Sequence, residues 1–174
     1  MNSACANRTG SRQSPAISSG EESASTVQAS SPASSTRAAR RAASSSTPPG
    51  GPPPHTDLSP QTCKALRHLD RVDFTCLERG DCGFRQFDAA WAAHTLAHEA
   101  FHLRGFQDEG VTECYALQNT AFVAERLGVS AERAEQLQAW IYARGYPNEP
   151  EEYHSAQCYS GGPLDLRPNV AKFP

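Results

Sequence analysis

Residues 88–105 read DAAWAAHTLAHEAFHLRG, and this stretch decides the fold of the chain. It is rich in alanine, the residue with the highest intrinsic helix propensity. Asp88 stands where an N-cap is expected, and Gly105 stands where a helix would end. The sequence therefore predicts a helix that begins after Asp88 and ends at Arg104.

Two further helices are predicted downstream of this segment. Asp108 is placed to cap a helix over 109–127, and Ser130 is placed to cap another over 131–144. The loops between these helices are short, which indicates that the helices pack against one another. Aromatic residues at helical spacing are predicted to lie in the core: Trp91, Phe101, Tyr115, Phe122 and Trp140.

Upstream, Ser59 followed by Pro60 predicts a first helix from residue 60 to about residue 70. Between residues 72 and 87, apolar residues alternate with the turn formers glycine and aspartate, so a small hairpin is expected. We therefore predict the fold class α+β, predominantly helical, with the segment after residue 145 wrapped irregularly over the surface.

Composition divides the 174 residues into two parts. Residues 1–56 are dominated by serine, alanine and proline and contain almost no large apolar side chains, so they are predicted to be a disordered tail. Residues 57–174 contain the helix signals and are predicted to form one compact domain.

The net charge of −3 provides no basic field, so nucleic acid is not expected as a partner. No apolar run approaches the roughly 18 residues of a membrane span, and the amino terminus lacks the apolar core of a signal peptide. A cytoplasmic location is therefore the default expectation.

The six cysteines are Cys5, Cys63, Cys76, Cys82, Cys114 and Cys158. Cys5 lies in the predicted tail, which leaves an odd number in residues 57–174. No CxxC pair is present, so a cysteine-based zinc site is not expected. We predict small buried cysteines, with one or two bridges and at least one unpaired thiol in the domain.

His98, Glu99 and His102 form an HExxH pattern inside the predicted helix. Positions i and i+4 lie about 40° apart around a helix, so both imidazoles can reach one zinc ion at about 2.0–2.1 Å. Glu99 then lies beside the ion, where it can take a proton from a zinc-held water molecule as general base. His94 precedes His98 by one turn and is interpreted as an outer or surface residue, because this pair brackets no glutamate.

The HEAFH segment in a helix resembles the zincin superfamily of metallopeptidases. The resemblance covers residues 88–127 and implies a small zincin-like domain, with an active-site helix packed on a helix that bears the third ligand. It also implies Zn²⁺ as the cofactor and a protein or peptide as the substrate.

Three carboxylates are candidates for the third ligand. Glu113 begins an ExxA pattern that looks like gluzincins, in particular the ImmA/IrrE type, and it lies on an apolar stripe where a buried charge needs a partner. Asp108 completes HExxHxxGxxD, a variant of the metzincin pattern, but the Met-turn of that family is missing. Glu109 lies one turn before Glu113. We predict Glu113 and retain Asp108 and Glu109 as alternatives.

The resemblance also implies a residue that stabilises the oxyanion, and Tyr146, Tyr153 and His154 are the candidates. The sequence thus predicts a zinc-dependent metallopeptidase that hydrolyses peptide bonds, with Glu99 as general base. The competing hypothesis is a non-catalytic helical binding module in which the histidines are idle or bind zinc structurally.

Overall fold

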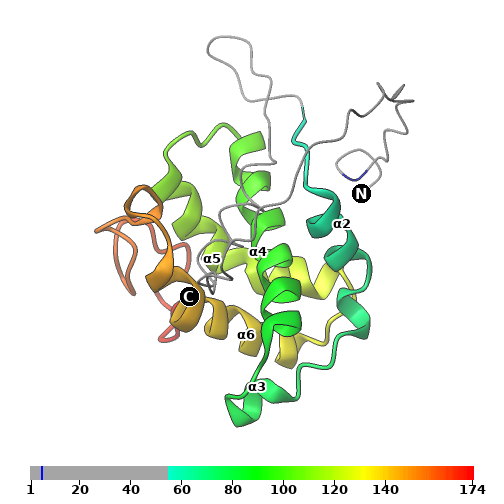
Figure 1. Ribbon diagram of the computed structural model, residues 1–174. Helices are drawn as coiled ribbons and strands as arrows, with labels where there is room; N and C mark the ends of the chain where they lie inside the picture. Colours follow the sequence, from blue (N-terminus) through cyan, green and yellow to red (C-terminus); the bar gives the residue numbers. More distant parts are fainter. Residues whose placement is uncertain (1–4, 6–54) are drawn as a thin grey trace, which may run out of the picture.

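A computed structural model describes Cys5 and residues 55–174 of the chain (Figure 1). Most of the tail predicted for residues 1–56 therefore lies outside the described residues. The longer helices are α2 (Pro60–Arg67), α4 (Phe84–Leu103), α5 (Glu109–Arg126) and α6 (Ala131–Trp140). The shorter turns are η1 (Leu69–Arg71), α3 (Cys76–Arg79), η2 (Ile141–Gly145), η3 (Tyr146–Asn148) and η4 (Glu151–Tyr153).

Helix α4 runs through the middle of the molecule (Figure 1), and α2, α5 and α6 all pack against it. It is buried on most of its circumference because its apolar positions do not form a single stripe. Small side chains allow the neighbouring helices to approach closely, and five of them are buried: Ala89, Ala90, Ala92, Ala93 and Ala97. The alanine-rich segment that predicted a helix therefore forms the centre of the fold.

This central helix begins earlier than predicted. Its N-cap is Gly83, and Asp88 lies inside the helix, so the prediction of an Asp88 cap is wrong. The extra first turn is stabilised by aromatic packing: Phe87 stacks on Trp91 at 5.5 Å between ring centroids and meets the edge of Trp140 at 5.6 Å.

The hairpin predicted between residues 72 and 87 is also wrong, since residues 55–174 contain no strand and the α+β class reduces to an all-helical domain. Phe74 is buried in the core, and Val72, Leu77 and Phe87 pack against it instead of pairing as strands, whereas Phe84 is 76% exposed. A disulfide between Cys76 and Cys82 closes a short loop around α3.

The helix boundaries after residue 105 agree closely with the sequence. Asp108 caps α5 by accepting a hydrogen bond from the Val111 amide at 2.8 Å, and α6 begins after Ser130. Phe122 is an exception among the predicted core aromatics, because 55% of it is exposed. The guanidinium of Arg126 lies over its ring, 5.0 Å from the ring centroid.

All six cysteines are paired, which corrects the prediction of an unpaired thiol. Cys5 bonds to Cys63 on α2, and Cys114 on α5 bonds to Cys158 in the carboxyl-terminal segment. The odd count arose because Cys5 was assigned to a separate tail. The Cys114–Cys158 bridge fixes the last part of the chain beside α5.

Candidate metal centre

The turn between α4 and α5 brings the predicted ligands together. At the end of α4, the Gly105 amide donates to the His102 carbonyl at 2.9 Å and the Phe106 amide donates to the Phe101 carbonyl at 3.2 Å. These two bonds form a Schellman motif, with Gly105 at a φ of 100° that favours glycine. The chain therefore reverses within a few residues, and the first residue of α5, Glu109, faces the last turns of α4.

Three side-chain atoms converge across this hairpin: Nε2 of His98, Nε2 of His102 and Oε2 of Glu109. The two imidazole nitrogens are 2.9 Å apart, and the carboxylate oxygen lies 3.1 Å from His98 and 3.4 Å from His102. We call these three residues the metal cluster. His98 is buried, whereas the side chains of His102 and Glu109 are 18% and 39% exposed, so the cluster lies at the solvent edge of the core.

The far nitrogen of each imidazole has its own partner. Nδ1 of His102 donates to the Phe106 carbonyl at 2.7 Å, and a carbonyl can only accept. Nδ1 of His98 lies 2.8 Å from Oε2 of Glu113, and an ionised carboxylate likewise only accepts. In the neutral imidazoles both Nε2 atoms therefore carry lone pairs that point into the cluster.

Three acceptors that face one another repel unless a metal ion or an added proton lies among them. Without a metal ion, a proton on Nε2 of His98 or His102 lets that imidazolium donate to Glu109. These hydrogen bonds from His102 and His98 lower the pKa of Glu109 to about 2. Burial by itself would lower the pKa of His102, but the hydrogen bonds to Glu109 and to the Phe106 carbonyl outweigh it and raise that pKa.

The spacing of the cluster fits a tetrahedral metal ion. Ligand atoms held about 2.0–2.1 Å from a tetrahedral zinc ion lie about 3.3 Å from one another. The three observed separations of 2.9, 3.1 and 3.4 Å are close to that value. Two imidazoles and one carboxylate are also a donor set that suits zinc. His98, His102 and Glu109 could therefore hold a metal ion.

Glu99 lies beside the cluster and is nearly buried, with 8% exposure. Its negative charge contributes to the raised pKa of His102. The hydroxyl of Thr56 donates a hydrogen bond to Oε2 of Glu99 at 2.7 Å, and Thr56 is itself buried. The segment that precedes α2 thus contacts the predicted general base.

The other two candidates for the third ligand lie elsewhere. Asp108 is exposed and its carboxylate caps α5. Glu113 is fully buried on the far side of the His98 ring, where it contacts Nδ1 of His98 and Nε2 of His94. The carboxylate that the structure brings to both Nε2 atoms is that of Glu109.

Of the candidates for oxyanion stabilisation, Tyr153 lies against a histidine of the cluster, with its ring centroid 5.8 Å from that of His98. Tyr146 and His154 pack on each other with ring centroids 4.6 Å apart. The backbone at His154 approaches α5 closely because Gly110 has no side chain, since a Cβ there would lie 2.6 Å from the His154 carbonyl oxygen. This close approach allows η4 to pack against the first turn of α5.

Several residues of the site are not marked by any sequence motif. Thr56 falls in a serine- and proline-rich stretch that resembles a linker, and the Phe106 carbonyl belongs to the backbone. Glu109 has one usable signal: in a tight hairpin, the first residue of the second helix faces the last turns of the first helix. His94 was expected to lie outside the cluster, and it does, although it is fully buried and not on the surface.

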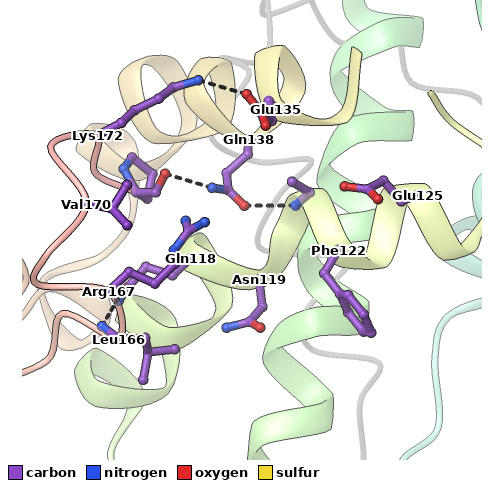
Figure 2. A pocket seen from close by; sticks show the side chains of 12 residues that line it. Gln118, Asn119, Phe122, Glu125, Glu135, Gln138, Leu166, Arg167, Val170 and Lys172 are labelled. Atoms are coloured by element: carbon purple, nitrogen blue, oxygen red, sulfur yellow. Dashed lines mark hydrogen bonds and ion pairs between the residues drawn. The ribbon is translucent and has the colours of Figure 1, made fainter. Parts of the chain in front are cut away.

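A separate cavity of about 410 Å³ lies between α5, α6 and the carboxyl-terminal segment (Figure 2). No member of the metal cluster lines it. Its wall includes the buried amides of Gln118 and Gln138, and its rim includes three exposed apolar residues: Phe122, Leu166 and Val170.

Comparisons with known proteins found no protein-family model, no curated protein and no solved structure that matches this chain. Among the described residues, no helix combines the length and the apolar character that a membrane span requires. The geometry of the metal cluster is therefore the basis for the functional conclusion.

Proposed function

We propose that residues 57–174 form a small zincin-like metallopeptidase in which His98, His102 and Glu109 hold Zn²⁺ and Glu99 is the general base. The observation that carries this proposal is the convergence of Nε2 of His98, Nε2 of His102 and Oε2 of Glu109 at separations of 2.9, 3.1 and 3.4 Å, close to those around a tetrahedral zinc ion. Glu109 replaces Glu113 as the proposed third ligand because, of the three candidate carboxylates, that of Glu109 faces the Nε2 atoms of both histidines.

When bound, zinc supplies Lewis acidity, which lowers the pKa of a water molecule and polarises the scissile carbonyl. Glu99 accepts a proton from the attacking water and transfers it to the leaving amine. The hydrogen bond from Thr56 engages Oε2 of Glu99 and fixes the carboxylate, which leaves Oε1 to accept that proton. The substrate is a protein or peptide.

The number of ligands favours the catalytic form over the competing binding module. A structural zinc site closes its shell with four protein ligands, whereas a catalytic site uses three and keeps one position open. Among the described residues, the cluster has three members. His102 and Glu109 are partly exposed, so a substrate can approach from the solvent side.

The test combines metal analysis with Glu99→Gln. The full chain is purified and its zinc content is measured by mass spectrometry, and hydrolysis of a fluorescently labelled unfolded protein is followed for the wild type and the variant. One ion per chain in both proteins, with hydrolysis only in the wild type, supports the proposal. Zinc-dependent hydrolysis that is unchanged in Glu99→Gln would overturn the role of Glu99.

A further inference from the structure

A chain of polar side chains extends from the metal cluster into the core. Thr120 Oγ1 lies 3.0 Å from Nδ1 of His94, Nε2 of His94 lies 2.7 Å from Oε1 of Glu113, and Oε2 of Glu113 lies 2.8 Å from Nδ1 of His98. His94, Glu113 and Thr120 are fully buried, and His98 is 3% exposed. We call these four residues the buried relay.

We propose that the buried relay is a positioning device, in which Glu113, held by His94, fixes His98 in the tautomer that presents an unprotonated Nε2 to the metal. This inference rests on the proposed function and extends it to residues that do not contact the ion. The carboxylate of Glu113 can only accept, so it keeps the proton of neutral His98 on Nδ1. The Thr120 hydroxyl donates to the Ala116 carbonyl at 2.8 Å, so it accepts from Nδ1 of His94. His94 as an imidazolium also donates from Nε2 to the other oxygen of Glu113, which prevents the carboxylate from turning away.

Because the relay is buried, it favours one tautomer of His98 over the other. An ionised carboxylate without partners in the core would be strongly destabilising, so both oxygens of Glu113 must be engaged for the side chain to remain there. If His98 carried its proton on Nε2, its Nδ1 lone pair would face a carboxylate oxygen at 2.8 Å. The relay therefore disfavours the tautomer that cannot bind metal.

The two ligand histidines are held in different ways. A neutral backbone carbonyl orients His102, whereas a carboxylate orients His98. A charged acceptor makes the imidazole a stronger electron donor to a metal ion than a neutral acceptor does. We therefore expect loss of the Glu113 charge to weaken the zinc bond to His98 without removing a ligand.

The matched variants are Glu113→Gln and Thr112→Val, on neighbouring residues of α5. Thr112 is fully buried and its hydroxyl has no hydrogen-bond partner among the described residues, so its loss tests the effect of a core substitution alone. Zinc affinity of the full-length chain is measured by competition with a chromophoric chelator. Glu113→Gln is expected to bind zinc about 10–100-fold more weakly than the wild type, and Thr112→Val is expected to be unchanged.

A second measurement does not depend on a variant or on zinc. Nitrogen-15 NMR of the metal-free wild-type chain, at mildly alkaline pH, reports which ring nitrogen of His98 carries the proton. The proposal predicts the Nδ1–H tautomer. An Nε2–H tautomer, or a folded Glu113→Gln protein with wild-type zinc affinity, would overturn it. A wild type that binds no zinc but shows the Nδ1–H tautomer would refute the proposed function and leave the role of Glu113 intact.

Discussion

Two polar groups of side chains lie beside α5, and their hydrogen bonding differs. In the cavity wall (Figure 2), Gln118 accepts a hydrogen bond from the Leu166 amide at 2.7 Å. Gln118 also donates to the Leu164 carbonyl at 2.9 Å. Gln138 donates to the Pro174 carbonyl and accepts from the Ala121 amide, both at 2.8 Å. Each donor meets an acceptor. In the metal cluster, by contrast, three atoms that can each bind a metal ion or share a proton face one another.

The two glutamines of the cavity wall have a structural role, whereas the metal cluster is the candidate functional site. The glutamine amides are satisfied within the protein, so they fasten the carboxyl-terminal segment to α5 and α6 and require nothing from outside. Nε2 of His98, Nε2 of His102 and Oε2 of Glu109 face one another, and either a metal ion or an added proton can bridge them. This cluster is therefore the place where a metal ion from outside the chain could bind.

The largest expected effect comes from His98→Ala. It removes a proposed ligand, so zinc affinity should fall well beyond the 10–100-fold loss typical of an outer partner. The measurement is zinc per chain by mass spectrometry after equilibration with a chelator. Gln118→Ala is the control from the cavity wall and should retain its zinc. Retention of zinc by His98→Ala would show that the cluster is not the metal site.

The second-largest expected effect shows which carboxylate is the third ligand. Glu109→Gln removes the charge and the ligand oxygen from the cluster, so zinc affinity should fall more than about 100-fold, beyond the range of an outer partner. Asp108→Asn is the matched control on the preceding residue, because asparagine caps a helix about as well as aspartate does. Both affinities are measured by chelator competition. A larger loss in Asp108→Asn would restore the metzincin-like ligand set.

The cavity wall should respond in stability and not in metal binding. Gln118→Leu leaves the buried Leu164 carbonyl without its partner, and a buried unsatisfied group costs about 1–3 kcal/mol, whereas the amide of the half-exposed Leu166 can turn to water. We expect the free energy of unfolding in urea to fall by about 2 kcal/mol, with the disulfides intact and zinc affinity unchanged. A parallel loss of zinc affinity would mean that the two regions are coupled through α5.

The helices that carry the site could be predicted from the sequence because their signals are local. Gly105 marks the end of α4, and Asp108 marks the start of α5. These two residues set the turn that places Glu109. The HExxH spacing likewise placed His98 and His102 on one face. Local chemistry therefore sufficed for two of the three members of the metal cluster.

The remaining features depend on contacts between distant residues. The choice of Glu109 over Glu113 depends on the register of α4 against α5, and helical periodicity places both on the same stripe. Thr56 contacts Glu99 across 43 residues, and Cys5 reaches Cys63 across 58 residues. No local pattern encodes such pairs. The error over the hairpin has the same origin, since packing of Phe74 into the core overrode its strand propensity.

The smallest expected effect is at Thr56, and it asks whether Glu99 behaves like the cavity amides or like the metal cluster. Thr56→Val keeps the shape of the side chain and removes the hydroxyl that donates to Glu99. The free energy of unfolding should fall by about 1 kcal/mol, the usual net value of one hydrogen bond. Thr56→Ser keeps the hydroxyl and is the control, and urea unfolding measures both. Zinc affinity should be unchanged in both variants, because neither touches a ligand. If Thr56→Val is as stable as the wild type, water replaces the hydroxyl at Glu99, and the proposed general base is held by solvent and not by the segment that precedes α2.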